Sequence, residues 1–405
     1  MSESKPLDNA LLQKHDVRPY GSDYTIYDII GDFLTEGQSE KPFYIIDLAE
    51  LVSAYQRWVN LLPNVKPYYA VKCNPNPVLI ETLAFLGCNF DAASENEIRS
   101  VIDITNDPSK IIYANPCKMC SQIRFARSVD VDLMTFDCRE ELDKIRLYHP
   151  YAKLILRIAV DDSASVCKFN KKFGCKLSQV EDVLKVAKML ELDVSGFSFH
   201  CGSGCGDPTK FYEAIGDCRK AYDIAKRNDI TVSLVDIGGG FEANDRKIKF
   251  EDVAMNINKA MEDFFKEELE NEKIKFIAEP GRFFAERSHT LVLNVIGKKM
   301  ETDEKGEKHI IYYLNDGLYG SFNCVVFDYK KVTILPFNER DGTLFRSTIW
   351  GPTCDSIDLI AENAMLPNLV VGESLFVESF GAYTCAASSS FNGFKTTINK
   401  YIYRS

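Results

Sequence analysis

A lysine at the end of an apolar run is the first pattern in this chain whose residue types could do chemistry. In the segment PYYAVKCNP, residues 67 to 75, Lys72 follows four apolar residues and precedes two Asn-Pro pairs. Unbroken apolar runs are typical of buried strands in parallel sheets, so the lysine is predicted to lie at a strand end. Such a lysine either extends its ammonium into water or, when desolvated, loses its proton and forms a Schiff base with a carbonyl compound. The segment alone leaves both interpretations open.

Three consecutive glycines, Gly238, Gly239 and Gly240, follow the apolar segment VSLVD. Glycine lets backbone N–H groups approach an anion closely, and the start of a helix favours negative charge. A tight strand-to-helix turn needs only one or two glycines, so three favour a phosphate site. The spacing matches neither GxGxxG nor the P-loop pattern, which points to a single phosphate rather than a nucleotide.

An acid and an arginine flank a turn in EPGRF, residues 279 to 283. A simple salt bridge would explain Glu279 and Arg282. If a pyridine ring binds nearby, Glu279 could instead keep the ring nitrogen protonated, and Arg282 could bind a phosphate through two hydrogen bonds. His200 ends the apolar run of FSFHCGSG. A lone histidine is more often a core or capping residue, but here it could stack on such a ring, and Ser203 could bond the phosphate.

Two further charges, Asp91 and Arg157, follow apolar segments without an evident structural role. Glu97 has a structural explanation, because Ser94 and Glu97 have the spacing of a capping box at a helix start.

The segment GPTCDSID gathers a thiol and two acids after another apolar stretch. Cys354 is either a buried thiol, as cysteines usually are, or a proton donor to a carbanion. Asp355 and Asp358 could receive a cation. Tyr383 lies among small residues in GAYTCAASSSFNGF, a pattern typical of a close turn or of a ligand contact.

Strand and helix patterns alternate from Lys66 onward and predict a (β/α)8 TIM-type barrel over residues 42–284, with a doubly wound sheet as the alternative. Strands are expected near residues 67–72, 88–92, 110–114, 132–136, 153–159, 194–200, 231–236 and 274–279. Their ends carry Lys72, Asp91, Asn115, Asp137, Arg157, His200, Asp236 and Glu279. Since a barrel places its chemistry at the C-terminal ends of many strands, this distribution favours closure.

Residues 285–405, together with 1–41, are predicted to form a second, all-β domain, because the helical period gives way to β-branched and alternating segments. Residues 1–40 are polar and irregular, and the strand PFYIID, residues 42–47, could pair with this domain.

Composition excludes several functions. The 405 residues carry a net charge of -11, which argues against nucleic acid and anionic membrane surfaces as partners. No apolar run approaches the roughly 20 residues of a membrane span, and the first residues lack the features of a signal peptide. Thirteen cysteines without a matched CxxC pair favour reduced thiols in a cytoplasmic protein. Five histidines, none in a metal-binding spacing, predict no metal site.

Nine of these motifs, in one order, resemble the fold type III pyridoxal-phosphate-dependent decarboxylases, and within them the eukaryotic-type ornithine decarboxylases. They are PYYAVKCNP, FDAASENEI, LRIAVDDS, FHCGSG, DIGGGF, EPGRFF, NDGLYGSFNC, WGPTCDSID and GAYTCAASSSFNGF. The resemblance covers about residues 40 to 395 and implies a barrel with an all-β domain, as in alanine racemase, that converts L-ornithine to putrescine and CO2.

The resemblance also implies a role for each matching residue. Lys72 would bind pyridoxal 5'-phosphate, Glu279 its ring nitrogen, and His200 its ring face. Phosphate contacts would come from Ser203, Gly238, Gly239, Gly240, Arg282 and Tyr383, and further cofactor-side contacts from Asp91, Glu97 and Arg157. Asp328 and Asp355 would hold the distal ammonium of the substrate, and Cys354 would be the proton donor. In the family Cys354 and Asp355 come from the partner subunit, which implies a homodimer with shared sites.

The chain departs from the family pattern at Phe327, where a tyrosine is expected beside Asp328, which leaves substrate detail open. It also lacks the extended C-terminal tail that marks some relatives for degradation, so turnover through such a tail is not expected. Residues 118 to 137 resemble the region where relatives bind antizyme.

Two alternatives stay open. One is a catalytically inactive regulator like the antizyme inhibitors, although such a protein would be free to lose catalytic positions that this chain keeps. The other is a decarboxylase of the same fold that acts on lysine, arginine or meso-diaminopimelate. Lysine is the hardest to exclude, because one methylene contributes only about 1 to 3 kcal/mol to discrimination. A related racemase would need a second base, typically a tyrosine, where this chain has Cys354.

Overall fold

The computed structural model describes residues 7–37, 40–245, 248–302, 306–338, 342–395 and 397–405. The chain folds into two compact units. The first, called the barrel unit below, comprises Val52–Phe284, and the second, the sheet unit, comprises the described residues up to Leu51 together with Ala285–Ser405. The division falls after Leu51 and after Phe284.

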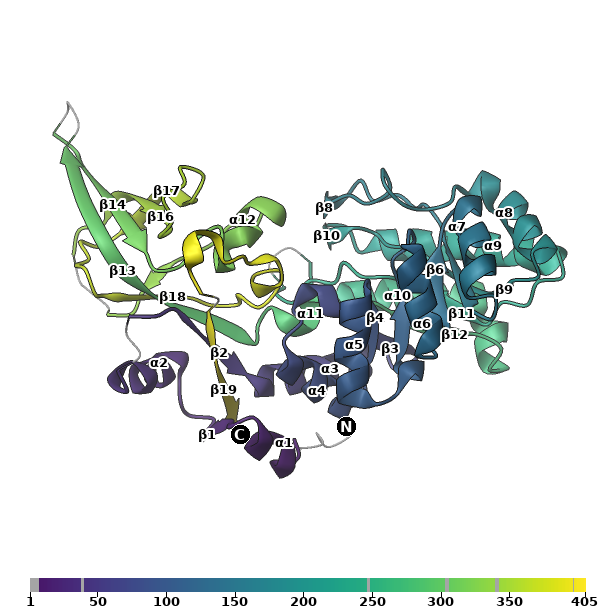
Figure 1. Ribbon diagram of the computed structural model, residues 1–405, viewed down its shortest axis with the longest axis horizontal. Coiled ribbons are helices and arrows are strands. Elements are labelled where there is room, and N and C mark those ends of the chain that lie inside the picture. Colours follow the sequence, from purple (N-terminus) through teal and green to yellow (C-terminus); the bar gives the residue numbers. More distant parts are fainter. Residues whose placement is uncertain (1–6, 38–39, 246–247, 303–305, 339–341, 396) are drawn as a thin grey trace. The chain divides into compact units, whose positions relative to one another are not determined.

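Eight parallel strands close into a barrel in the barrel unit (Figure 1). In chain order they are β3 (Val65–Ala70), β4 (Asn89–Ala92), β5 (Ile111–Tyr113), β6 (Leu133–Phe136), β7 (Lys153–Arg157), β9 (Asp193–Ser198), β11 (Leu234–Asp236) and β12 (Lys275–Ala278). The last strand returns to the first, with Phe276 opposite Val65. All eight strands match the predicted segments, so the barrel is confirmed and the doubly wound alternative is wrong.

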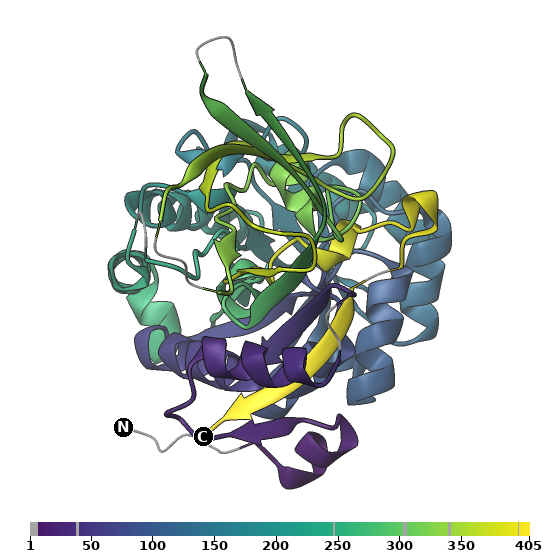
Figure 2. The ribbon, with the colours of Figure 1, turned by 90° about the vertical axis from the view of Figure 1, so that its left-hand side faces the viewer.

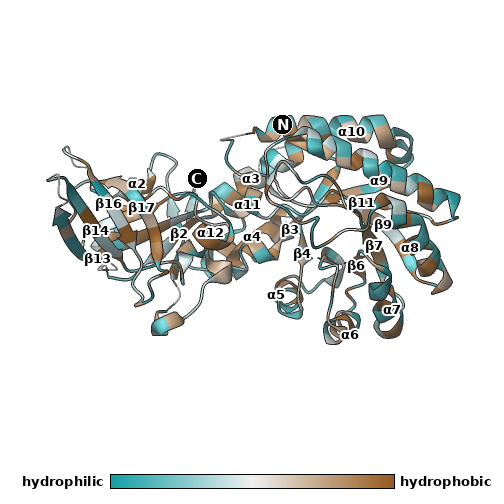
Figure 3. Ribbon diagram, turned by 90° about the horizontal axis from the view of Figure 1, so that it is seen from above, coloured by the Kyte–Doolittle hydropathy of each residue, from teal (hydrophilic) through white to brown (hydrophobic). Residues whose placement is uncertain are grey.

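Helices surround the barrel and turn their apolar residues inward, as the hydropathy colours of Figure 3 show. They are α4 (Pro77–Leu86), α5 (Glu95–Thr105), α6 (Cys120–Ser128), α7 (Arg139–Tyr148), α8 (Leu177–Met189), α9 (Thr209–Arg227) and α10 (Phe250–Glu270). Helix α4 shows why each helix starts and stops where it does. Asn76 accepts the N–H groups of Val78 and Leu79, Pro77 opens the first turn, and Gly87 ends the helix in the left-handed conformation.

A short antiparallel pair, β8 (Ser165–Cys167) and β10 (Ser203–Cys205), lies outside the barrel ring. It was not predicted, because each strand has only three residues. The pair joins the loop after β7 to the loop after β9, so Ser203 lies opposite Cys167.

The sheet unit contains a nine-stranded sheet, whose curved strands are turned toward the viewer in Figure 2. Its main path runs β1 (Arg18–Tyr20), β19 (Ile398–Arg404), β2 (Phe43–Asp47), β13 (His289–Thr302), β14 (Lys308–Leu314), β16 (Phe345–Trp350) and β17 (Leu359–Leu366). Two more strands, β15 (Leu335–Pro336) and β18 (Ser374–Val377), pair beside β13. Strand β2 pairs with β13 and β19, which confirms that PFYIID joins the β domain.

Residues 7–37 are not irregular, so for this described part of residues 1–40 the prediction is wrong. Helices α1 (Asn9–Lys14) and α2 (Ile26–Thr35) form there, and α2 begins with a complete capping box between Thr25 and Asp28. Its apolar residues Ile29, Ile30 and Phe33 are buried in a cluster with residues of β2, β13 and β19. Helix α3 (Leu48–Leu61) then leads from β2 into the barrel.

Among the described residues, no helix combines the length and the apolar character that a membrane crossing requires. In the same part of the chain, none of the thirteen cysteines forms a disulfide.

Candidate active site at the barrel mouth

Lys72 forms an ion pair with Asp91 at the C-terminal ends of β3 and β4. Lys72 lies in a single 3-10 turn, Val71–Cys73, directly after β3, rather than within the strand as predicted. Its side chain is 41% exposed, whereas that of Asp91 is fully buried. The lysine is therefore neither a simple solvated ammonium nor a core residue, because a buried carboxylate holds it at the barrel mouth.

The three glycines lie against the loop that follows β9. A Cβ on Gly238 or Gly240, both at positive φ, would overlap the carbonyl oxygens of Phe199 and Gly202. A Cβ on Gly239 would come within 2.7 Å of the Glu279 carbonyl oxygen. No larger residue fits in this turn, so the three glycines are required for its packing as well as for the approach of an anion.

Arg282 and Ser203 lie beside this turn, on α11 (Arg282–Ala285) and β10. Nη2 of Arg282 donates to Oγ of Ser203 at 3.4 Å. Three of the segments predicted to bind phosphate therefore meet at one edge of the barrel mouth.

Two buried carboxyl groups, Asp236 and Glu279, lie at the ends of adjacent strands β11 and β12. Burial, together with the charges of Asp236 and Asp91, raises the pKa of Glu279 well above its ordinary value. Burial also raises the pKa of Asp236. Both carboxyl groups therefore ionise less readily than they would in water.

Arg157 is buried among these acids at the end of β7. Burial lowers the pKa of its guanidinium, and the charges of Glu279, Asp137 and Asp236 oppose that effect. Its Nε and Nη2 atoms, like Oδ1 of Asp91, have no hydrogen-bond partner among the described residues. Buried unsatisfied groups of this kind at a strand end indicate that a polar ligand binds between them.

His200 has a neutral imidazole. Burial and the charges of Arg157 and Lys72 hold its pKa well below the ordinary value. Nδ1 accepts the N–H of Gly202 at 2.9 Å, so a neutral ring carries its proton on Nε2. Phe169 meets the ring edge-on, with the two centroids 4.9 Å apart. The neutral ring is thus held in one orientation.

Glu97 takes only half of its predicted capping role. Oγ of Ser94 accepts the N–H of Glu97 at 3.4 Å, as a capping box requires. However, the Glu97 carboxylate accepts the N–H of Ala93 at 2.6 Å rather than that of Ser94. Burial raises the pKa of Glu97, although the hydrogen bond from Ala93 opposes that effect.

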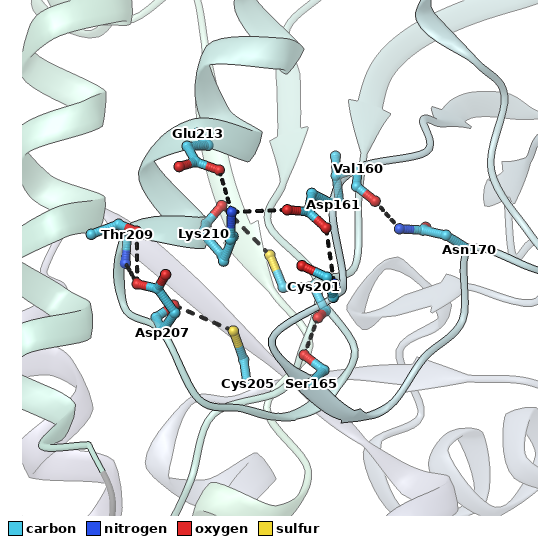
Figure 4. A network of polar contacts seen from close by, with 11 residues as sticks. Val160, Asp161, Ser165, Asn170, Cys201, Cys205, Asp207, Thr209, Lys210 and Glu213 are labelled. Carbon is cyan, nitrogen blue, oxygen red and sulfur yellow. Dashed lines mark hydrogen bonds and ion pairs between the residues drawn. The ribbon is translucent and has the colours of Figure 1, made fainter.

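A polar network fixes the loop that covers this side of the mouth (Figure 4). Lys210, at the start of α9, bonds Asp161 at 2.9 Å and Glu213 at 2.8 Å. Ser165 donates its hydroxyl to the carbonyl of Cys201, next to His200. The loop after β7 is thereby tied to the residues that position His200 and Ser203.

In the sheet unit, the predicted catalytic thiol lies on exposed turns. The backbone N–H and the Sγ of Cys354 both lie 3.2 Å from Oδ1 of Asn392. Oδ2 of Asp355 accepts the hydroxyl of Tyr319 at 2.5 Å, and this bond lowers the pKa of Asp355. Tyr319 and Asn392 were not predicted, although both lie inside motifs that were singled out, NDGLYGSFNC and GAYTCAASSSFNGF.

Asp358 does not receive a cation, and that prediction is wrong. Its carboxylate is buried and accepts the N–H of Leu318 at 2.7 Å, together with the N–H and hydroxyl of Thr353 at 3.0 and 2.6 Å. Because every partner is a donor from the chain itself, Asp358 is an anchor for the loop that carries Cys354.

The remaining predicted residues also belong to the sheet unit. Phe327 ends the short helix α12 (Cys324–Phe327) and is 70% exposed, and Asp328 caps that helix. Tyr383 lies in a turn in the left-handed conformation, with φ of 57°.

Known proteins resemble this chain over most of its length. Residues 48–286 match the pyridoxal binding domain of the pyridoxal-dependent decarboxylases. The chain belongs to this family. This decarboxylase is 42% identical to ornithine decarboxylase of Rattus norvegicus over 395 residues. The matched region covers 94% of this chain and 85% of the relative. It is 44% identical to antizyme inhibitor 2 of Xenopus laevis over 378 residues, covering 91% and 82% of the two chains.

Solved structures of decarboxylases share the fold. The arginine decarboxylase of Paramecium bursaria Chlorella virus matches with a TM-score of 0.87 and 36% identity, covering 93% of this chain and 100% of that one. A lysine/ornithine decarboxylase of Vibrio vulnificus, complexed with putrescine, matches with a TM-score of 0.82 and 32% identity, covering 93% and 98%.

The cofactor of this decarboxylase is pyridoxal phosphate. The barrel mouth fits that group on its own evidence. It offers a lysine for the aldehyde, a glycine turn with Ser203 and Arg282 for the phosphate, and buried acids for the ring nitrogen. The buried atoms of Arg157 and Asp91 that lack a hydrogen-bond partner among the described residues could bond to polar groups of the cofactor.

Proposed function

We propose that this protein converts L-ornithine to putrescine and CO2 in polyamine biosynthesis. The observation that carries the proposal is the Lys72–Asp91 pair at a barrel mouth that also gathers Ser203, the three glycines and Arg282. The identity of 42% and 43% to the ornithine decarboxylases of Rattus norvegicus and Mus musculus, over 94% of this chain, supports ornithine as the substrate.

Bound pyridoxal phosphate supplies an electron sink for the pair of electrons that remains when CO2 leaves. Lys72 would attach the cofactor, and the Asp91 carboxylate balances the ammonium charge of Lys72 when this lysine is free. Ser203, Gly238–Gly240 and Arg282 would hold the phosphate. Glu97 and Arg157 complete the polar surroundings of the ring.

The pair Glu279 and Asp236 keeps a proton at the ring nitrogen, because both carboxyls are buried and neither ionises readily. His200 lies against the ring as a neutral imidazole, which adds no positive charge next to the cofactor. Both features favour electron flow into the ring.

Substrate selection and the final proton belong to the sheet unit. The carboxylates of Asp328 and Asp355 bind the distal ammonium of ornithine, and the hydrogen bond from Tyr319 keeps Asp355 ionised. Cys354 gives its proton to the substrate carbon that has lost CO2.

A homodimer with shared sites is part of this proposal, with Cys354 and Asp355 acting in the partner's barrel. Support comes from exposed apolar side chains near them, which include Phe327 and Tyr329, each 70% exposed, and Ile357. A cavity of about 320 Å³ lies in the same place, between Leu318 and Phe327. Exposed apolar patches of this kind are typical of interfaces between subunits.

Subunit mixing tests the shared sites. Lys72→Ala and Cys354→Ala homodimers should each be inactive, and exchange of subunits should restore about a quarter of wild-type activity, because one site of each mixed dimer is intact while half of the dimers are mixed. No recovery, with exchange verified by mass spectrometry, would contradict shared sites.

The substrate is tested by CO2 release from L-ornithine, L-lysine and L-arginine on purified protein supplied with pyridoxal phosphate. Preference for ornithine by at least about tenfold is expected, since one methylene and its cavity correspond to roughly 1 to 3 kcal/mol. The structural neighbours at 30 to 36% identity include arginine and lysine decarboxylases, so preference for either of those substrates is the second candidate function.

A regulator without activity is favoured by one observation, the 44% identity to an antizyme inhibitor. Against it, the chain retains the Lys72–Asp91 ion pair, Arg157 and Cys354, which a partner-binding protein does not need. Purified protein without the visible absorbance of bound pyridoxal phosphate would reverse this choice.

An antizyme-like protein is a candidate partner of α6. There Arg124 lies 4.8 Å from the ring of Tyr148, and Arg127 lies 5.7 Å from the ring of Tyr151. These guanidinium groups suit an acidic surface. Arg124→Glu combined with Arg127→Glu should weaken the binding of an antizyme at least tenfold, as measured by calorimetry, while decarboxylation is unchanged.

A further inference from the structure

One amide oxygen contacts Cys354 at two atoms. Both the backbone N–H and the thiol of Cys354 lie 3.2 Å from Oδ1 of Asn392. Because a backbone N–H can only donate, the amide must present its oxygen, rather than its nitrogen, to Cys354. The thiol therefore faces an acceptor.

An acceptor at this position distinguishes the two protonation states of the sulfur. The S–H bond can point at the amide oxygen, whereas a thiolate at the same distance would face the oxygen's lone pairs. We infer that Asn392 is a positioning residue for Cys354, whose amide oxygen orients the S–H bond of the thiol and faces a thiolate unfavourably. This inference rests on the proposed function, in which Cys354 is the proton donor.

The turn that carries Asn392 has the geometry for this task. Asn392 adopts φ of 55° and ψ of 13°, a left-handed conformation that asparagine adopts more readily than most residues. The N–H of Ser389 donates to the Tyr319 carbonyl at 2.8 Å. The rings of Tyr319 and Phe391 stack with their centroids 4.3 Å apart.

Tyr319 also fixes the other side of the contact. Its hydroxyl donates to Asp355, the residue next to Cys354. A single side chain therefore ties the Asn392 turn and the Cys354 loop together, and the separation of amide and thiol does not depend on either loop alone.

The proton balance of the step is simple. The S–H bond breaks as the proton moves to the substrate carbon, and a thiolate remains. That thiolate takes a proton from water before the next turnover. The Asn392 oxygen favours this return, because it stabilises the S–H form.

The test is the rate at which iodoacetamide alkylates Cys354, since only the thiolate reacts. Cys354 is exposed, and its peptide is quantified by mass spectrometry against that of Cys117, another exposed cysteine in the same sample. The rate at pH 7 should rise roughly three- to tenfold in Asn392→Gly, which loses the amide oxygen that accepts both the thiol and the backbone N–H of Cys354 but keeps the turn. It should fall at least about tenfold in Asn392→Asp, because a carboxylate is a stronger acceptor and opposes the thiolate.

A matched control is Asn363→Gly. Asn363 is an exposed residue in β17 that also has positive φ, 59°. This variant should leave the Cys354 rate unchanged. Equal rates in wild type, Asn392→Gly and Asn392→Asp would overturn the inference, as would a rise in both Asn392 variants, which would indicate loosening of the loop alone.

The alkylation assay needs no substrate, so its result is independent of the proposed reaction. If the two variants shift the rate in opposite directions but wild type releases no CO2 from ornithine, the proposed function fails and the thiol contact stands. If ornithine is decarboxylated and the rates do not shift, only the role of Asn392 fails. With both intact, Asn392→Gly should lower kcat more than it changes KM.

Discussion

The barrel mouth and the Cys354 loops hold reactive groups in opposite ways. At the mouth, Asp91 and Asp236 are buried and Glu279 is half-buried at strand ends, and burial and neighbouring charges raise the pKa of Asp236 and Glu279. Around Cys354 the side chains lie on exposed turns, and hydrogen bonds from neighbouring loops hold them. The first arrangement depends on a closed ring of strands, and the second on a few contacts.

This difference teaches where each kind of chemistry can be placed. A rigid ring tolerates several buried charges, because neighbouring strands fix their separation. A turn has no such frame, so one buried acid, Asp358, anchors the Cys354 loop through three hydrogen bonds. Substitutions should therefore affect the two regions differently.

The largest effect is expected at the barrel mouth. Lys72→Ala should reduce decarboxylation by at least about a thousandfold, because the covalent attachment and orientation of the cofactor are lost. The visible absorbance of lysine-bound pyridoxal phosphate should disappear from the purified protein. Persistence of that absorbance would assign the cofactor to another lysine.

The next effect tests the anchor of the exposed loops. Asp358→Ala should lower the free energy of unfolding by about 3 to 5 kcal/mol, because the buried donors of Leu318 and Thr353 lose their acceptor. Urea denaturation measures this change. Asp358→Asn, which keeps the shape and one acceptor, should cost about 1 to 2 kcal/mol. Similar stability of all three proteins would mean that the loop has another anchor.

A smaller, pH-dependent effect is expected from Asp236. Burial raises its pKa from the ordinary value of 3.8 to about 7 in the folded protein. Between these values the folded state holds a proton that the unfolded state releases, so this group makes the free energy of unfolding fall as pH rises from about 4 to about 7. Outside that window its contribution is constant.

Asp236→Asn should remove this dependence while it keeps the acceptor for the Gly238 N–H. The difference in unfolding free energy between the variant and the wild type, both without cofactor, should grow by about 4 kcal/mol across the window. A difference that does not vary with pH would show that Asp236 is ionised in the folded state. Because His200 is present in both proteins, its contribution to the unfolding free energy cancels in this difference.

The smallest effect concerns substrate detail at an exposed position. Phe327→Tyr adds a hydroxyl beside Asp328, and one new hydrogen bond corresponds to a change in KM for ornithine of less than about tenfold. The ratio of kcat/KM for ornithine and lysine measures it. A larger change would mean that this exposed side chain controls selectivity as strongly as the buried groups do.

The sequence predicted the barrel well, because each strand is an apolar run followed by a polar residue at the mouth. It misplaced Lys72 by a short turn, since a 3-10 turn after a strand has no apolar signature of its own. Strand β17, with the sequence LIAENAML, was missed because most of its residues are partly exposed and its pattern does not alternate.

The site in the sheet unit was predicted only in part. Cys354 and Asp355 could be recognised from their own motif, but their partners Asn392 and Tyr319 are 38 and 36 residues away in the chain. Contacts at that distance depend on how turns pack, which no local pattern encodes. The same reason explains why Asp358 was mistaken for a cation ligand.

The position of β19 has a consequence for synthesis on the ribosome. This strand, Ile398–Arg404, lies between β1 and β2 in the interior of the sheet, with parallel neighbours on both sides. The barrel strands end at Ala278, so they leave the exit tunnel more than a hundred residues earlier. Domains generally fold as they emerge. We therefore expect β1, whose neighbour in the sheet is β19, to stay unpaired until the end of translation, and β2 to keep one open edge after it pairs with β13. A chaperone would be needed in this period to prevent aggregation through these edges.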